Sequence, residues 1–210
     1  TAGACSFVKL AVTVGFDATF VIRALARLGA GREFYLLYAM TGGENDKRSL
    51  DTVNDIIKVL RAGSGVAVDL RNPASALERL AGLDVDAMVL AGGPRLLVLL
   101  AFVAAVVKKI KLYVVPEYQD EPLDLTSLVR LPEVEALTRP RLAVLSALDG
   151  AMDYREVASK VGLDSTTVLR HLNALEQRGL VERVERSVYR TDVLTVAMAR
   201  LYLQQNYTRL

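Results

Sequence analysis

Cysteine and histidine are almost absent from this sequence. The 210 residues include one cysteine, Cys5, and one histidine, His171. A single cysteine excludes a disulfide within the chain and a zinc site built from cysteines, and it suits a reducing, cytoplasmic setting. One histidine leaves a metal ion almost no ligands except carboxylates. We therefore expect no metal site and no metal cofactor.

Strong net charge and long apolar runs are also missing. The formal net charge is only +2, so nucleic-acid binding has to depend on the pattern of exposed residues rather than on bulk charge. The longest charge-free apolar run, Leu96 to Val107, is shorter than the ~20 residues that a membrane span needs. We expect no secretory signal and no membrane span, and we interpret this run as a helix buried between a sheet and a partner surface.

The first part of the chain alternates five times between short apolar runs and longer segments of helical spacing. The apolar runs, typical of buried parallel strands, are 9–15, 34–40, 66–70, 87–91 and 112–115. The helical segments between them are 18–28, 47–62, 73–81 and 95–109. This alternation predicts an α/β doubly wound (Rossmann-like) parallel sheet domain, with a further strand or a connection at 121–128.

Two prolines and a change of rhythm within 130–140 mark a domain boundary. We therefore predict a Rossmann-like domain at residues 1–130 and a winged helix-turn-helix domain at 131–210. Its three helices and hairpin are expected at 138–148, 153–162, 164–180 and 180–192. A last helix, 193–205, has no obvious partner within so small a domain, so we predict that it pairs with a second copy.

The helix at 164–180 has the pattern of a DNA recognition helix. Its outer face is polar and short at its start, where side chains approach base edges. We expect Arg170 to contact guanine, Asn173 and Gln177 to contact adenine, and Thr166 and Thr167 to contact phosphate or a thymine methyl group. The hairpin arginines, Arg186 and Arg190, would reach the DNA backbone or minor groove. The alternatives are a solvated helix face or a winged helix that contacts protein.

Two loops of the predicted sheet meet where its strand order reverses, which is the usual ligand position in such sheets. In one, Gly15 follows the first strand and Asp17 or Thr19 starts a helix. In the other, Gly92 and Gly93 precede Pro94 and Arg95. The glycines permit close approach, and two helix starts with one arginine favour an anion. The alternative is a tight strand-to-helix turn. A dinucleotide fingerprint, a Walker lysine and a catalytic triad are missing, so no enzyme activity is expected.

The stretches "VGFDATFVIRAL" and "LAGGPRLLVLL", joined to a C-terminal winged helix, resemble the CRISPR-associated Rossmann-fold (CARF) transcriptional regulators of archaea. The resemblance implies sensor domains paired about a two-fold axis, with cyclic oligoadenylate, typically the tetranucleotide, in a shared pocket. The ligand-binding residues that it implies are Phe16, Asp17, Thr19, Gly92, Gly93 and Arg95.

Two positions depart from this family pattern. Ala91 stands where many relatives carry Ser or Thr, and Pro94 replaces a residue that could donate a hydrogen bond. The resemblance implies a homodimeric, ligand-sensing regulator that binds double-stranded DNA at CRISPR-associated promoters. The alternatives are a ring nuclease that cleaves cyclic oligoadenylate, aided by Thr19 and Arg95, and an interaction module that recruits CRISPR effector subunits.

Overall fold

The structure is a computed structural model that describes residues 9–29, 33–119 and 121–205. Cys5 lies outside these residues. Contacts divide the chain into two compact units, Thr1–Val129 and Arg130–Leu210. Each unit is described by itself.

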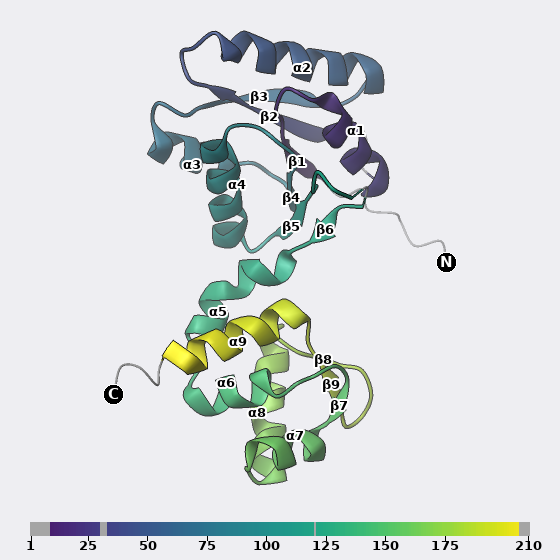
Figure 1. Cartoon of the computed structure of the whole chain (residues 1–210), viewed down its shortest axis with the longest axis vertical. Helices are drawn as coiled ribbons and strands as arrows, with labels where there is room; N and C mark the ends of the chain where they lie inside the picture. Colours follow the sequence, from purple (N-terminus) through teal and green to yellow (C-terminus); the bar gives the residue numbers. More distant parts are fainter. Residues whose placement is uncertain (1–8, 30–32, 120, 206–210) are drawn as a thin grey trace. The chain divides into compact units, whose positions relative to one another are not determined.

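A six-stranded sheet forms the centre of the first unit (Figure 1). Its strands are β1 (Leu10–Thr13), β2 (Phe34–Met40), β3 (Ser64–Asp69), β4 (Ala87–Leu90), β5 (Lys111–Val114) and β6 (Leu123–Asp124). The spatial order is β3-β2-β1-β4-β5-β6, in which the first five strands are parallel and β6 pairs antiparallel with β5. The predicted doubly wound sheet with its reversal between β1 and β4 is confirmed.

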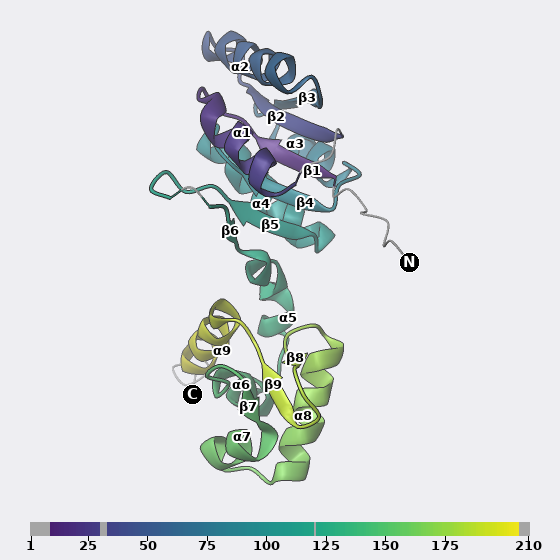
Figure 2. The ribbon, with the colours of Figure 1, turned by 90° about the vertical axis from the view of Figure 1, so that its right-hand side faces the viewer.

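Two helices cover each face of this sheet (Figures 1 and 2). They are α1 (Ala18–Arg27) and α2 (Asn45–Leu60) on one face, and α3 (Pro73–Ala81) and α4 (Arg95–Lys108) on the other. All four residues of β1 and all four of β4 are buried, because helices shield both sides of these central strands. This double shielding explains why the strands read as continuous apolar runs.

Helix α4 is apolar on both of its sides. Its inner side buries Leu97, Ala101, Ala104 and Ala105 against the sheet. Its outer side exposes four apolar residues at helical spacing, here called the α4 outer stripe: Leu96, Leu99, Val103 and Val107. No described residue covers this stripe fully, and the partner surface expected for the long apolar run stays a prediction.

Short helical segments follow the sheet where the sequence predicted only a boundary. A 3-10 helix, η1 (Thr126–Arg130), leads into α5 (Leu131–Glu135). Val129 packs in the core of the first unit, and Val134 is buried in the second. The prolines that suggested a boundary are compatible with this, because Pro132 lies in the first turn of α5, where its missing amide costs nothing.

The second unit is a winged helix-turn-helix, as predicted. Its elements are α6 (Arg139–Ser146), β7 (Met152–Asp153), α7 (Tyr154–Val161), α8 (Ser165–Gln177), β8 (Glu182–Arg183), β9 (Val188–Arg190) and α9 (Val193–Gln205). The two-residue strand β7 was not predicted, and it completes a small sheet in the order β7-β9-β8. Gly162 ends α7 with a φ of 68°, a left-handed conformation that glycine adopts without steric cost.

The expectation that the last helix lacks a partner in its own domain is wrong. Helix α9 packs against α6 and α5, and it buries Thr195, Val196, Met198 and Ala199. The sequence analysis did not recognise α5, and it overlooked that α6, which makes most of the contact with α9, could receive this helix within the domain. The outer side of α9 still exposes Val193 and Leu201.

Candidate functional site

Backbone meets backbone where the loops after β1 and β4 converge. A Cβ atom on Gly15 would lie 2.8 Å from the amide nitrogen of Gly93, and one on Gly93 would lie 2.9 Å from the carbonyl oxygen of Val14. Gly93 also has a φ of 104°. The glycine break in the apolar run is therefore required by this close packing, whatever the loops bind.

A buried threonine ties these two loops together. The Thr13 side chain, at the end of β1, is fully buried, and its Oγ1 accepts hydrogen bonds from the amides of Ala91 (3.1 Å) and Gly92 (3.3 Å). The amide of Gly92, one of the predicted ligand residues, is thus bonded within the chain. The sequence analysis missed Thr13, although a hydroxyl residue inside an apolar strand was a visible signal.

The start of α1 already holds a negative charge. Asp17 is its N-cap, and the carboxylate accepts a hydrogen bond from the Thr19 amide at 2.8 Å. This hydrogen bond lowers the pKa of Asp17, so the group is ionised at neutral pH. Asp17 is one of the two residues expected to start this helix. The expectation that both helix starts favour an anion needs correction, because a carboxylate of the chain already occupies this one.

The start of α4 is open by comparison. Pro94 is its N-cap, and no side chain caps the helix. The first amides of an α-helix have no partner inside the helix, and they favour a negative charge. The exposed Arg95 follows at once and forms no ion pair with any described residue. Of the two predicted helix starts, α4 is the one suited to an anion.

A pocket of about 340 Å³ lies where the loops after β1, β2 and β4 meet. The residues that line it are Gly15, Phe16, Ala39, Thr41, Asn45, Asp46, Ser49, Gly93 and Pro94. Of the six predicted ligand residues, the structure brings Phe16 and Gly93 to this pocket; Asp17, Thr19, Gly92 and Arg95 do not line it. The loop after β2 was missed. Its signal was "TGGEND", a glycine-rich stretch after the strand that neighbours β1.

Asp46 holds the loop after β2 in shape. Its carboxylate accepts hydrogen bonds from the Thr41 amide (2.9 Å), the Thr41 hydroxyl (2.7 Å) and the Gly42 amide (2.8 Å). These hydrogen bonds lower the pKa of Asp46, and those from Thr41 have the largest effect. Beside this loop the Arg48 guanidinium lies 4.5 Å from the centre of the Phe16 ring. The pocket therefore combines an exposed aromatic ring with neutral polar groups and the Asp46 carboxylate, which is ionised at neutral pH.

In the second unit, α8 presents the polar face that the sequence predicted. Asp164 caps the helix by accepting hydrogen bonds from the amides of Thr166 (3.2 Å) and Thr167 (2.8 Å). Its inner side buries Val168, Leu172 and Leu175. Thr166, Arg170 and Gln177 are exposed, and Thr167 is half-buried.

Asn173 is placed differently from the expectation. Its Oδ1 accepts hydrogen bonds from Arg183 Nη2 at 2.7 Å and from the Tyr189 hydroxyl at 2.9 Å. An asparagine that reads adenine needs this oxygen to accept from the base. The adenine contact expected for Asn173 is therefore not available in this arrangement. Arg183 was missed, because a hairpin residue gives no sequence signal of contact with a helix ten residues earlier.

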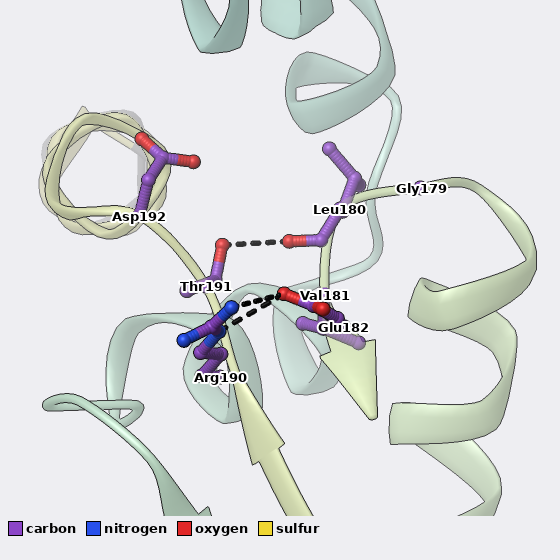
Figure 3. A pocket seen from close by; sticks show the side chains of 7 residues that line it. All are labelled: Gly179, Leu180, Val181, Glu182, Arg190, Thr191 and Asp192. Carbon is purple, nitrogen blue, oxygen red and sulfur yellow. Dashed lines mark hydrogen bonds and ion pairs between the residues drawn. The ribbon is translucent and has the colours of Figure 1, made fainter. Parts of the chain in front are cut away.

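The hairpin arginines differ in their surroundings. Arg190 donates from Nε to Glu182 Oε2 at 2.9 Å, and Arg186 is exposed and forms no ion pair with the described residues. Figure 3 shows the Arg190 contact in a shallow pocket of about 500 Å³, where the Thr191 hydroxyl also donates to the Leu180 carbonyl at 2.7 Å. The Asp192 carboxylate, also drawn there, accepts hydrogen bonds from the amides of Leu194 and Thr195 at 3.0 Å. Since these polar groups are already bonded within the chain, the pocket offers no evident ligand site.

Metal and membrane features were searched among the residues that the structure describes. They contain no cluster of three or more His, Cys, Asp or Glu side chains suited to a metal ion. None of their helices is both long and apolar enough to cross a bilayer. His171 is half-buried on α8, and burial, with the charges of Arg141 and Arg170, lowers its pKa.

The fold and the two sites define a class of protein in which a Rossmann-like domain with a loop-lined pocket precedes a winged helix-turn-helix. Residues 8–126 match the model of the Csa3 CRISPR-associated Rossmann-like domain, and residues 142–182 match that of the winged helix-turn-helix DNA-binding family. The chain is 44% identical to the CRISPR locus-related protein Csa3 of Thermoproteus tenax over 195 residues, 92% of this chain and 96% of the relative. This chain belongs to the Csa3 family.

Among solved structures, similar proteins include VC1899 from Vibrio cholerae, with 12% identity and a TM-score of 0.40, which covers 93% of this chain and 65% of that one. Another is Can2 from Sulfobacillus thermosulfidooxidans in complex with cyclic tetra-adenylate, with 12% identity and a TM-score of 0.35, which covers 95% of this chain and 62% of that one. The chain spans less than two thirds of the length of each. These likenesses are too low to assign a ligand.

Proposed function

We propose that this protein is a homodimeric transcriptional regulator of CRISPR-associated loci that senses cyclic oligoadenylate, most simply cyclic tetraadenylate. DNA binding is assigned to the winged helix and ligand binding to the Rossmann-like unit. Membership of the Csa3 family supports the cellular setting. The observation that carries the ligand proposal is the pocket beside the uncapped start of α4.

The two sides of this site suit the two parts of such a ligand. Phosphates suit the amides at the start of α4 and the Arg95 guanidinium. A flat base suits the neighbouring pocket, where Phe16 offers an aromatic face and Asn45 a neutral amide. The side chains that line the pocket include no cation, which favours a neutral base over a phosphate inside it.

DNA contacts are proposed for the exposed start of α8 and the hairpin. Arg170 is exposed, and its Nη2 donates to the Thr167 hydroxyl at 3.5 Å. A contact this long is easily exchanged for a contact to guanine. Gln177 is exposed for an adenine contact, and Thr166 and Thr167 lie at the helix start, where phosphate binds. Arg186 is exposed for the DNA backbone or minor groove. Arg190 can join only by leaving Glu182.

A symmetric dimer is proposed because paired winged helices read paired half-sites. Two apolar surfaces support it, the α4 outer stripe and the outer side of α9. Leu99 on α4 is 60% exposed, and Val193 and Leu201 on α9 are 83% and 58% exposed. The role of α9 in pairing thus rests on its outer side alone, because its inner side packs within the unit.

The ligand proposal is tested by thermal shift with cyclic oligoadenylates of different ring sizes, since a bound ligand raises apparent stability. We expect stabilisation of the wild-type protein, and its loss in Arg95→Ala and in Phe16→Ala. Arg79→Ala, at another exposed arginine, on α3, should behave as wild type. Absence of stabilisation by every ring size would reject the sensing role. Release of linear products in the same mixtures would instead identify a ring nuclease.

The DNA proposal is tested by fluorescence anisotropy at matched salt with a duplex selected in vitro by the wild-type protein. Arg170→Ala combined with Arg186→Ala should weaken binding at least about tenfold, because a guanine contact and a phosphate contact are lost. Arg79→Ala is again the control. Unchanged binding would exclude this surface, and a wild-type protein that no duplex retains even at low salt would favour an interaction module.

A further inference from the structure

Four side chains join the recognition helix to the hairpin, here called the wing clamp: Asn173 and Glu176 on α8, Arg183 on β8 and Tyr189 on β9. Arg183 Nη2 donates to Asn173 Oδ1 at 2.7 Å and to Glu176 Oε2 at 2.8 Å. The Tyr189 hydroxyl donates to the same Asn173 oxygen at 2.9 Å. One amide oxygen on the helix thus receives a hydrogen bond from each strand of the hairpin.

The clamp is buried on one side and open on the other. Tyr189 is fully buried, and burial raises the pKa of its hydroxyl, which therefore stays a donor at neutral pH. The Arg183 guanidinium lies 5.0 Å from the centre of the Tyr189 ring. The side chains of Arg183 and Glu176 are 39% and 36% exposed. Because Tyr189 is buried, it can affect DNA binding only through other residues.

Besides the clamp, the hairpin is attached to the start of α7, because β9 pairs with β7 and the Tyr154 amide donates to the Ser187 carbonyl at 3.0 Å. Strand β8 has two residues and β9 has three, so the strands share few backbone hydrogen bonds. Strand β8 lies at the edge of this small sheet and pairs only with β9, and sheets of such short strands twist easily. Side-chain bonds between helix and hairpin therefore have a large share in setting where the hairpin tip, with Arg186, lies relative to Arg170.

We propose that Asn173 is a positioning residue for DNA binding, which with Tyr189 and Arg183 fixes the wing to the recognition helix so that Arg186 and Arg170 engage one site together. This proposal rests on the proposed function, since it presumes that the winged helix binds DNA. It replaces a base contact by Asn173 with an indirect role. The clamp reduces the freedom that the wing loses on binding, which strengthens binding without adding a contact.

Tyr189→Phe is the decisive variant, because it removes one buried hydroxyl that cannot touch DNA. We expect DNA affinity to fall about threefold, the size of a lost hydrogen bond of ordinary strength. The fall should disappear in an Arg186→Ala background, because a misplaced wing matters only if its arginine binds. If Tyr189 affected only the stability of the fold, the losses of DNA binding free energy caused by Tyr189→Phe and by Arg186→Ala would add in the double variant. Tyr202→Phe on α9, in the same unit, should leave affinity unchanged.

Asn173→Ala separates positioning from base reading. With the selected duplex and its single-base-pair variants, positioning predicts the same fold-loss on every duplex, whereas a base reader would lose its preference at one base pair. Circular dichroism melting checks that Tyr189→Phe is folded. Should it not fold, Arg183→Met, which breaks the clamp from its exposed side, is put through the same cycle with Arg186→Ala.

The outcomes separate this proposal from the function on which it rests. If the wild-type protein binds no duplex, the DNA-binding function fails and the clamp with it. If the wild-type protein binds, and Tyr189→Phe or its substitute is without effect or additive with Arg186→Ala, only the clamp is rejected. A base-specific loss in Asn173→Ala would also reject the clamp and restore Asn173 as a reader of adenine.

Discussion

Thr13 is the residue on which the geometry at the β1 and β4 loops depends most directly. Its hydroxyl is the acceptor for two amides of the β4 loop. Thr13→Val keeps the shape of the side chain and leaves both amides without this partner, which should lower the free energy of unfolding by about 2 kcal/mol or more. Urea unfolding measures the loss.

Thr13→Ser is the control for this change, because it keeps the acceptor and removes only a methyl group, with a cost of about 1 kcal/mol. A Thr13→Val protein as stable as Thr13→Ser would show that the hydroxyl does not hold the loops together. The ligand-induced thermal shift should fall with Thr13→Val as well, since the start of α4 follows directly from the β4 loop.

Asp17 gives a prediction of opposite sign to its expected role. Asp17→Asn keeps a good N-cap for α1 and removes the ionised carboxylate near the candidate anion site. We expect cyclic oligoadenylate to bind severalfold more tightly to this variant at low salt, with a smaller gain at high salt, because the effect is electrostatic. Isothermal titration at two salt concentrations measures it. Weaker binding would instead show that the carboxylate contacts the ligand.

Helix α8 contains a group that makes the stability of the second unit depend on pH. Burial lowers the pKa of His171 in the folded protein below 6.5, the value for an unperturbed histidine. Below that pH the unfolded chain binds a proton more readily than the folded chain, so the free energy of unfolding decreases as the pH falls. Above it, both states are neutral and the decrease is absent.

We therefore expect urea midpoints to be lower at about pH 5.5 than at about pH 7.5, and the difference to shrink in His171→Gln. The carboxylates with resolved shifts, Asp164 on the same helix among them, have pKa values lowered from 3.8 and stay ionised across this range. An equal pH dependence in wild type and His171→Gln would contradict the assignment to this histidine.

At the scale of the whole molecule, the first property to test is the formation of the proposed dimer. Leu99→Glu on the α4 outer stripe and Leu201→Glu on α9 each place a charge in an exposed apolar surface. We expect each to shift the protein from dimer to monomer in size-exclusion chromatography with light scattering, and the double variant to be monomeric. Val59→Glu, at a 66% exposed apolar residue on α2, is the matched control.

Coupling between ligand and DNA is the second quantity. If cyclic oligoadenylate changes the Kd for DNA by some factor, DNA must change the Kd for the ligand by the same factor. Both factors can be measured by anisotropy and by titration calorimetry. Unequal factors would show that the two measurements do not follow one binding scheme.

The outcome of the dimer test is read separately. If the double variant Leu99→Glu with Leu201→Glu is still a dimer, neither proposed surface forms the dimer interface.

The sequence by itself determined the fold of both units. Periods of apolar residues are local properties of the chain, so the five parallel strands, the four covering helices and the three helices and hairpin of the winged helix could be predicted within a few residues. Turn glycines and prolines gave the ends of the elements for the same reason. The two-residue strand β7 and the short helix α5 carry too few residues for a period of apolar residues, and they were missed. The position of the candidate pocket followed from strand order, because parallel strands bring their carboxyl ends to one edge.

Only the tertiary structure decided which groups at those places are available. Gly92 and Asn173 both lie where the sequence predicted a binding group. The Gly92 amide, however, already donates to Thr13. The Asn173 side-chain oxygen already accepts from Arg183 and Tyr189. Whether such a hydrogen bond forms depends on differences of a few tenths of an ångström in the distance between donor and acceptor. The pattern of residues in a sequence does not give these distances. A pattern shows where a polar group lies, and packing decides whether it is already bonded.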